Sequence, residues 1–383
     1  MQHDLETVSK SLPQNSTIKV LGLASYPEAA AATRFRVLQY AERLKDHGID
    51  LDVSPAINSK AFKTLYSHTS MVKRASTVAS AILKRTLGII GLRKYDLLFL
   101  QREALFFGPP LFEKAYMWFG KLPMVLDLDD ATYLKYDSPT FGKIGSKLKF
   151  FGKTDDLIDR AEIVICGNPN IAEYVCSRGA KSIVLPTTVD GRIFCPVKSN
   201  NSKPVIGWIG THSTYPFLEN IFRVFERLAQ NYDFKLLIVG SGETAPAISG
   251  IEVESRPWTL ETEVSDFQAI DIGLYPMFVS NSASVEWLNG KSGFKAIQYM
   301  AVGKPFVMSP VGVASSIGIP DKTHFNADNV DDWYVKLESL LKDRDLSEKM
   351  GSAGRNYFLE HFDLTKQARY LAGILKDTAR SRD

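Results

Sequence analysis

Short apolar segments alternate with longer amphipathic segments along the first half of the chain. The apolar segments cover residues 18–23, 49–53, 95–100, 124–128, 162–166 and 182–185. They are too short for most helices and have the length of buried strands. Residues 33–47 carry helical spacing and end at Gly48, whereas residues 54–94 are less regular but mostly helical in character. Strands that alternate with helices predict a parallel sheet.

The same alternation begins again after residue 204. Apolar segments that predict strands cover residues 205–209, 234–239, 251–254, 271–275, 305–308 and 323–325. Amphipathic segments that predict helices cover residues 216–230, 263–270, 293–302, 330–342, 346–360 and 364–378. Residues 186–204 are rich in Pro, Ser and Asn and have the composition of a linker.

A chain of 383 residues has the usual length of two domains. We therefore expect an α/β protein with an N-terminal Rossmann-like domain over 1–195 and a second one over 196–360. The remaining segment, 361–383, is long enough for one further helix at the C-terminus.

A polar loop that contains glycines precedes the helix expected over residues 293–302. Its residues Lys291, Ser292 and Gly293 would place the first N–H groups of that helix at the end of strand 271–275. A helix start of this kind favours an anion. Lys291, Lys295 and Gln298 fall within one narrow stripe. The sequence predicts an anion site made of two lysines and an amide.

Two further glycine turns close predicted strands of the second half. Gly210 is followed by Thr211 and His212, and Gly240 and Gly242 follow the next strand. Glycine lets the backbone approach a phosphate closely, although a Gly-x-x-Gly pair is as often a simple tight turn. His212 is either a phosphate ligand or an ordinary surface histidine.

The segment AIQYMAVGKPFVMSPVG, residues 296–312, resembles the signature of the family 4 glycosyltransferases. These enzymes have the GT-B fold, two Rossmann-like α/β/α domains facing across a cleft, with a C-terminal helix that crosses back to the first domain. Their pattern has two glutamates eight positions apart. Gly290 and Gln298 stand at those positions in this chain.

The resemblance implies a role for each matching residue of the second domain. Gln298 would hold the ribose of a UDP- or GDP-sugar donor, whereas Gly290 cannot make the usual contact with the donor sugar. Arg256 and Trp258 stand where the family contacts the base, and a tryptophan there could stack on it or simply cap the sheet edge. The usual Arg/Lys pair after Gly210 is missing, and His212, Lys291 and Lys295 could replace its charge.

Three carboxylates, those of Asp127, Asp129 and Asp130, lie at the end of the strand expected over 124–128. The segment resembles the one in which the family places a histidine or aspartate beside the reacting sugar. We favour Asp129 or Asp130 as the group that orients or deprotonates the acceptor. A metal-binding Asp-x-Asp and helix capping remain alternatives, and the GT-B resemblance implies chemistry without a metal.

Three arginines of the first half are candidate anion ligands. Arg34 and Arg36 resemble an Arg-x-Arg of related transferases that would bind an anionic acceptor or the donor phosphates. Arg102 lies at the same sheet edge as the aspartates and could face a phosphate or pair with them. Exposed helix faces and surface ion pairs are the competing interpretations.

Residues 54–94 contain eight Lys or Arg and no Asp or Glu. The pairs Lys73-Arg74 and Lys84-Arg85 are about three helical turns apart and should share one face, whereas Val72, Ala79 and Ile82 line another. A basic amphipathic helix of this kind suits an anionic bilayer. The segment 60–94 is thus either a membrane-docking surface or a helix packed on its own domain.

Composition narrows the classes of function. With 45% hydrophobic and 23% charged residues the chain is globular, and a net charge of +3 is too small to indicate nucleic-acid binding. Cys166, Cys176 and Cys195 lack metal or disulfide spacing.

A polar N-terminus and short apolar runs predict a cytoplasmic protein without signal peptide or membrane span, at most peripheral at the inner membrane face. Val285 stands where a P-loop needs glycine, which excludes an NTPase.

The sequence therefore predicts a hexosyltransferase of polysaccharide biosynthesis. It would move a sugar from a nucleotide-sugar to a hydroxyl of a glycan or lipid-linked acceptor, with retention of configuration and without a metal or other cofactor. Two alternatives are a sugar-nucleotide epimerase of the same fold and a non-catalytic nucleotide-sugar-binding subunit.

Overall fold

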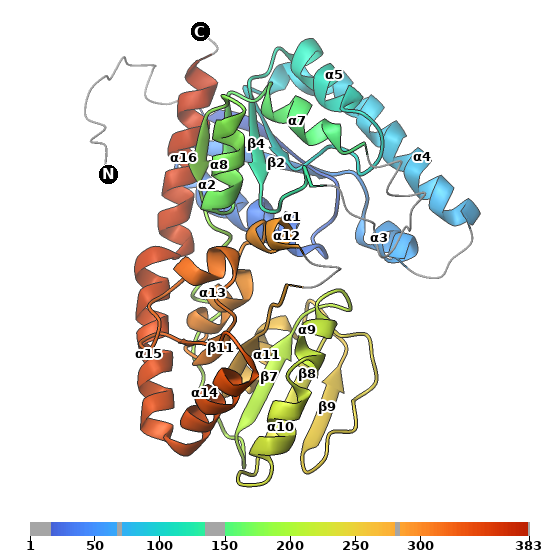
Figure 1. Cartoon of the computed structure of the whole chain (residues 1–383). Helices are drawn as coiled ribbons and strands as arrows, with labels where there is room; N and C mark the ends of the chain where they lie inside the picture. Colours follow the sequence, from blue (N-terminus) through green and yellow to red (C-terminus); the bar gives the residue numbers. More distant parts are fainter. Residues whose placement is uncertain (1–16, 67–70, 135–149, 280–283, 382–383) are drawn as a thin grey trace.

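The computed structural model describes residues 17–66, 71–134, 150–279 and 284–381, and contains two six-stranded parallel sheets (Figure 1). The first sheet has the order β2-β1-β3-β4-β5-β6, and the second has the order β12-β11-β10-β7-β8-β9. In each sheet the order reverses beside the first strand. Such a reversal places the functional edge of a doubly wound sheet at the carboxyl ends of the strands.

All twelve strands lie where the alternation of apolar segments predicts them, within a few residues at each end. The strands of the first sheet are β1 (Ile18–Ala24), β2 (Ile49–Pro55), β3 (Leu97–Gln101), β4 (Met124–Leu128), β5 (Ile163–Cys166) and β6 (Ser182–Val184). The strands of the second sheet are β7 (Val205–Ile209), β8 (Lys235–Val239), β9 (Glu252–Arg256), β10 (Ile272–Tyr275), β11 (Phe306–Met308) and β12 (Phe325–Asn326).

Helices cover both faces of the first sheet because both faces of its strands are apolar. Helices α5 (Leu111–Gly120), α7 (Gly152–Ile158) and α8 (Pro169–Ser177) pack on one face around Leu98 and Leu126. The other face, around Val20 and Phe99, is covered by α2 (Ala41–Lys45) and by the C-terminal helix α16 (Leu364–Arg380).

The C-terminal helix crosses back to the first domain, as the fold prediction required. It follows α15 (Arg344–His361), and its Leu364, Leu371 and Leu375 are buried against the first sheet. Figure 1 shows α15 beside the second sheet and α16 continuing along the first. The domain limits at 195 and 360 stay predictions; β6 ends at Val184 and β7 begins at Val205.

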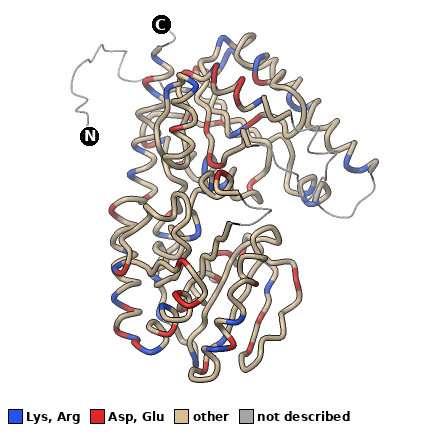
Figure 2. The backbone as a smooth tube through the Cα atoms, viewed as in Figure 1, with Lys and Arg blue, Asp and Glu red and all other residues tan. Residues whose placement is uncertain are grey.

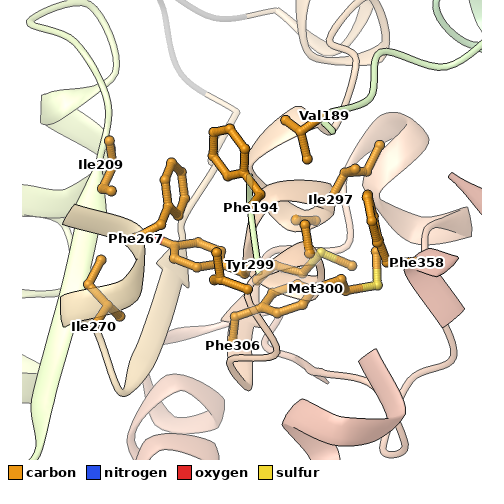
Figure 3. Close-up of a cluster of buried hydrophobic side chains, with 14 of the residues drawn as sticks. Val189, Phe194, Ile209, Phe267, Ile270, Ile297, Tyr299, Met300, Phe306 and Phe358 are labelled. Atoms are coloured by element: carbon orange, nitrogen blue, oxygen red, sulfur yellow. The ribbon is translucent and has the colours of Figure 1, made fainter. Parts of the chain in front are cut away.

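The second sheet is also covered on both faces. Helices α9 (Tyr215–Glu219), α10 (Phe222–Leu228) and α14 (Val330–Lys342) pack on one face. Helices α11 (Glu263–Ala269), α13 (Phe294–Ala301) and α15 pack on the other face, whose core is drawn in Figure 3. This core also includes Phe35, Val189 and Phe194 from outside the second sheet. The two domains thus share apolar contacts.

Two helices predicted as continuous are interrupted. The segment 33–47 forms α1 (Ala31–Arg36), a 3-10 turn over Leu38–Tyr40, and then α2, because Val37 leaves helical dihedral angles at φ −126° and ψ −63°. The segment 216–230 is divided between α9 and α10 at Ile221, with φ −110° and ψ 9°. Helical spacing continues across such breaks, so the sequence pattern does not reveal them.

The basic segment forms three helical pieces, α3 (Ser59–Tyr66), α4 (Met71–Gly88) and the 3-10 turn η2 (Ile89–Lys94). One part of the prediction for it is wrong. Arg85 does not share an exposed basic face with Lys84, because its side chain is fully buried. It donates hydrogen bonds to the main-chain carbonyls of Ala24, Ser54 and Ala104.

Candidate active site

The loop from Gly290 to Gly293 joins α12 (Val285–Asn289) to α13 and lies against the first domain. Gly293 precedes the first residue of α13 and has φ 63°. This left-handed conformation favours glycine, and a Cβ there would clash with the Ile317 side chain. The sequence therefore begins α13 where the prediction placed the start of the helix.

Lys295 and Gln298 lie together on the first turns of α13. The Lys295 Nζ donates to the Gln298 Oε1 at 3.2 Å. Gln298 is fully buried, and its Nε2 has no hydrogen-bond partner among the described residues. A buried donor without a partner costs about 1–3 kcal/mol, so a ligand oxygen here would relieve that cost.

The ammonium group of Lys295 lies where the two domains meet. The pKa of Lys295 is lowered to about 8, mainly by burial; the carboxylate of Glu263 opposes this shift, and the guanidinium of Arg34 adds a smaller lowering. An anion beside the ammonium group would favour its charged form. Lys295 is therefore a cation whose charge is only partly balanced by the protein itself.

Lys291 bridges the two domains. Its Nζ lies 3.1 Å from Asp130 Oδ2 and 3.9 Å from the centre of the Trp287 ring. The loop that carries it is held by Asn168, the N-cap residue of α8, which donates to the carbonyls of Asn289 and Lys291 at 3.2 and 3.0 Å. The first domain therefore fixes the position of the Lys291 main chain.

Gly290 packs directly on the first domain. A Cβ at Gly290 would lie far inside van der Waals contact of the Ala131 side chain and 3.3 Å from its amide nitrogen. The signature glutamate that Gly290 replaces therefore has no room in this arrangement of the domains. The close approach of the two backbones gives a physical reason for the glycine.

The three aspartates at the end of β4 have different surroundings. Asp127 is buried in an ion pair with Arg36, which also donates to the Leu185 carbonyl at 2.6 Å. Asp129 accepts two hydrogen bonds from Arg102 at 2.6 and 2.9 Å. Burial would raise the pKa of Asp129, but the Arg102 guanidinium outweighs burial and lowers it. Only Asp130 is substantially exposed, with 33% of its side chain accessible.

The expectations for Arg36 and Asp129 therefore need correction, and of the two alternatives for Arg102 the structure shows pairing with the aspartates. Arg36 is only 1% exposed and is not available to an acceptor or phosphate. Arg102 holds Asp129 and lies 3.8 Å from Asp130 Oδ2, so its charge already faces carboxylates. Asp129, kept ionised and 9% exposed, is a poor proton acceptor. Asp130 is the carboxylate of this group that a substrate could reach.

Arg34 lies in the domain interface. Its Nη2 lies 2.8 Å from Glu263 Oε2 of the second domain, and its guanidinium lies 5.4 Å from the centre of the Trp258 ring. The side chain of Arg34 is 10% exposed and that of Glu263 is 6% exposed. We correct the expectation that Arg34 is a free anion ligand, because this buried ion pair joins the two domains.

The glycine turns bring the ends of β7 and β8 together. A Cβ at Gly240, which has φ 82°, would clash with the Gly210 carbonyl, and Gly210 itself packs on the Trp208 side chain. Gly242 has φ 79° and open space around it, and Thr211 and His212 are exposed. The close contacts of Gly210 and Gly240 explain these glycines by local packing alone. Among the described residues, no contact brings His212 beside Lys295.

Arg256 is also engaged within its own domain. It forms ion pairs with Glu254 and, at 3.2 Å, with Asp266. Trp258 is half-buried against the core of the second domain, with its Cβ near Gly240. The guanidinium of Arg256 is thus neutralised by carboxylates of its own domain, which corrects the expectation that it is available to contact the base of a donor.

Sequence reasoning missed four residues of this region, namely Asn168, Asn170, Ala131 and Glu263. Asn170 donates to the Asn289 carbonyl at 3.1 Å. The Asn-Pro pair at 168–169 is a helix-start signal that could have placed Asn168 at the N-cap of α8. Nothing local marks Glu263 or Ala131, whose partners are more than a hundred residues away in the sequence. In the described part of the chain no three His, Cys, Asp or Glu side chains are grouped to hold a metal ion.

Comparison with known proteins gives a family match within the second half of the chain and structural matches for the whole fold. The family model "Glycosyl transferases group 1" matches residues 203–343. No curated protein matches this chain.

Three solved structures share the architecture over nearly all of the chain. Sucrose-phosphate synthase from Thermosynechococcus elongatus is 13% identical, with a TM-score of 0.65 over 95% of this chain and 100% of its own. A glycosyltransferase from Rickettsia africae is 14% identical, with a TM-score of 0.65 over 95% of this chain and 99% of its own. HepE from Anabaena, in complex with UDP-glucose, is 15% identical, with a TM-score of 0.64 over 94% of this chain and 100% of its own. Residues 203–343 thus match the group 1 glycosyltransferase model, and the overall fold of the chain is GT-B.

Proposed function

We propose that this glycosyltransferase moves a hexosyl group from a UDP- or GDP-sugar to a hydroxyl of a glycan or lipid-linked acceptor. Retention of configuration, catalysis without a metal and a place in polysaccharide biosynthesis in the cytoplasm belong to the same proposal. The observation that carries it is the pairing of Lys295 with the buried amide of Gln298 at the start of α13. The structure of HepE with UDP-glucose supports a nucleotide-sugar donor.

The chemical requirement of the reaction is stabilisation of a diphosphate leaving group. Negative charge grows on the diphosphate as the glycosidic bond breaks, and fixed positive groups lower the barrier. Lys295, Lys291 and the first amides of α13 would supply that field. Gln298 would bind a ribose hydroxyl, since its Nε2 is a buried donor without a partner among the described residues.

Asp130 would act on the acceptor side of the reaction. Without a ligand it is paired with Lys291 at 3.1 Å. A donor diphosphate would compete for Lys291 and release the Asp130 carboxylate towards an acceptor hydroxyl. Asp129 would keep Arg102 in place beside it, as a positioning residue with no direct part in proton transfer.

Donor binding and turnover test this proposal together. A thermal-shift series with UDP-, GDP- and ADP-sugars would identify the base, and a coupled assay for released nucleoside diphosphate would then measure turnover. Lys295→Ala should lower kcat by about 10²–10³-fold, the usual effect of removing one group that stabilises the transition state. Lys349→Ala, which removes an exposed lysine of α15, is the control. Equal turnover in both variants would exclude this site.

One observation favours a second candidate, a nucleotide-sugar-binding subunit without activity. The signature glutamate has no room at Gly290, so one family contact with the donor sugar is missing. Such a subunit would bind donor with the same dependence on Lys295 but release no diphosphate, with or without acceptor.

A further inference from the structure

Helix α4 exposes most of its large apolar residues, whereas two of its polar residues, Thr77 and Arg85, are buried. Thr77, Ala81 and Arg85, spaced four residues apart, are the buried positions that face the domain. On the opposite side Val72 is 76% exposed, and Leu83 and Leu87 are 59% and 57% exposed. The stripe continues into η2 at Ile90, 82% exposed. Soluble helices normally show the reverse arrangement.

The charges around this stripe have one sign. Between residues 54 and 94 there is no Asp or Glu, and Figure 2 shows only blue and tan positions along α4. Lys73 and Lys84 lie at the border of the stripe, since they fall about 100–120° from Val72 on a helical wheel. A second copy of the same surface would therefore meet electrostatic repulsion, whereas an anionic surface would be attracted.

A groove runs between α3 and α4 beside the stripe. Its volume is about 390 Å³, and Lys60, Lys73 and Lys84 contribute to its lining. Hydroxyl groups of Ser76 and Ser80 line it as well, and its described lining includes no carboxylate. Three ammonium groups and several hydroxyls around one groove are suited to a phosphate group.

We propose that α4 lies in the plane of an anionic phospholipid bilayer, with the stripe from Val72 to Ile90 in the acyl-chain boundary. The α3–α4 groove would hold the phosphate of one anionic phospholipid whose acyl chains lie along the stripe. This proposal is independent of the proposed sugar transfer. It replaces the predicted basic face of 60–94 by an apolar stripe bordered by lysines.

Because α4 is anchored to the first domain, we expect this helix to lie on the bilayer rather than to cross it. Residues Val72–Lys94 are long and apolar enough to span a membrane by length and composition, and 17% of that window is buried. However, Arg85 is bound to three main-chain carbonyls of the first domain, and Tyr116 of α5 donates to the Arg85 carbonyl at 2.9 Å. Spanning would break this buried network, whereas docking in the plane preserves it.

Sedimentation of the full chain with lipid vesicles tests the proposal. Vesicles of phosphatidylcholine alone are compared with vesicles that also contain phosphatidylglycerol, and inorganic phosphate is the soluble competitor. We expect binding only to the anionic vesicles, because the lysines add electrostatic attraction to a modest apolar area. Equal binding to neutral vesicles would overturn the groove as a site for an anionic lipid. Displacement of the protein by inorganic phosphate at a concentration equal to that of the vesicle lipid phosphate would overturn it as well.

Two variants separate the stripe from the groove. Leu83→Glu with Leu87→Glu should lower the vesicle partition coefficient by about 10-fold or more, and Lys60→Glu with Lys73→Glu should lower it for anionic vesicles only. Because all four side chains are exposed, these variants should fold. Val335→Glu on α14, 53% exposed, and Lys349→Glu are the matched controls. Unchanged partition of the double-leucine variant would overturn the proposal.

Discussion

At the scale of single residues, Gly290 and Lys295 mark how this chain differs from the family pattern it resembles. Gly290 lets the backbone of the second domain touch Ala131 of the first. Lys295 carries its charge in a buried interface where only Glu263 lies close enough to offset the burial. In the proposed function, Gly290 removes a usual sugar contact of the family and Lys295 supplies a cation to the site.

We predict that Gly290→Ala destabilises the protein by about 1–3 kcal/mol, because the new methyl group overpacks the contact with Ala131. Urea unfolding would measure the change. Combining it with Ala131→Gly should recover much of the loss, whereas Gly91→Ala, which adds a methyl group in open space, is the control. Additive effects of the two substitutions would show that the contact is absent in solution.

Donor affinity should also depend on pH through Lys295. Since burial lowers the pKa of Lys295 to about 8, the side chain is charged below that value and loses its proton as the pH rises through it. Donor affinity should therefore fall between about pH 7 and pH 9. Calorimetry on wild type and Lys295→Arg would test this, because arginine stays charged and should flatten the dependence. The same pH profile in both proteins would argue against the assignment.

At the scale of secondary-structure elements, helix ends position the site. Helix α13 begins at a left-handed glycine, and α8 begins at Asn168, whose amide binds two carbonyls around Lys291. A change at the start of one helix is therefore transmitted to a loop in the other domain.

We predict that Asn168→Asp raises the donor KM with little loss of helix stability. Aspartate keeps the cap oxygen that accepts from the Ile171 amide at 2.8 Å, but it loses both donors to the Asn289 and Lys291 carbonyls. A cost of about 1–3 kcal/mol, the range for an unpaired buried group, corresponds to roughly a 5- to 150-fold weaker donor. Asn168→Ala should lose the cap as well, and thermal unfolding distinguishes the two variants. A normal KM in Asn168→Asp would mean that the loop is held by other contacts.

At the scale of the whole molecule, the domains are joined by a few cross-domain contacts around the site. The Arg34–Glu263 ion pair is largely buried, and Phe35 packs on Phe294 with ring centres 4.7 Å apart. Asp130–Lys291 is a more exposed third contact. These contacts stabilise the observed arrangement of the two domains.

Arg34→Ala should open the molecule. The substitution leaves Glu263 buried without its partner, a change that typically costs about 3–5 kcal/mol, and separation of the domains relieves it. Small-angle scattering should show a larger radius of gyration than for wild type. The double substitution Arg34→Ala with Glu263→Gln, which leaves neither charge buried without its partner, should have a smaller effect. An unchanged radius for Arg34→Ala would show that apolar contacts alone hold the domains together.

The family resemblance implied the crossing C-terminal helix, whereas apolar and glycine patterns by themselves predicted the strands of the two sheets and the start of α13. The strands and the helix start depend on apolar periodicity and glycine conformation, which act over a few residues. That Lys291, Lys295 and Gln298 form one site stays a prediction. Lys295 and Gln298 contact each other on α13, whereas Lys291 lies in the loop before the helix and pairs with Asp130.

Only the tertiary structure decided which charges are available to a ligand. Arg34, Arg36, Arg102 and Arg256 look alike in the sequence, yet each is paired with a carboxylate, and in the first three cases that carboxylate lies far away along the chain. The same holds for α4, where burial of Arg85 turns the apolar stripe outward. Pairing and burial depend on contacts between distant segments, so no local pattern can predict them.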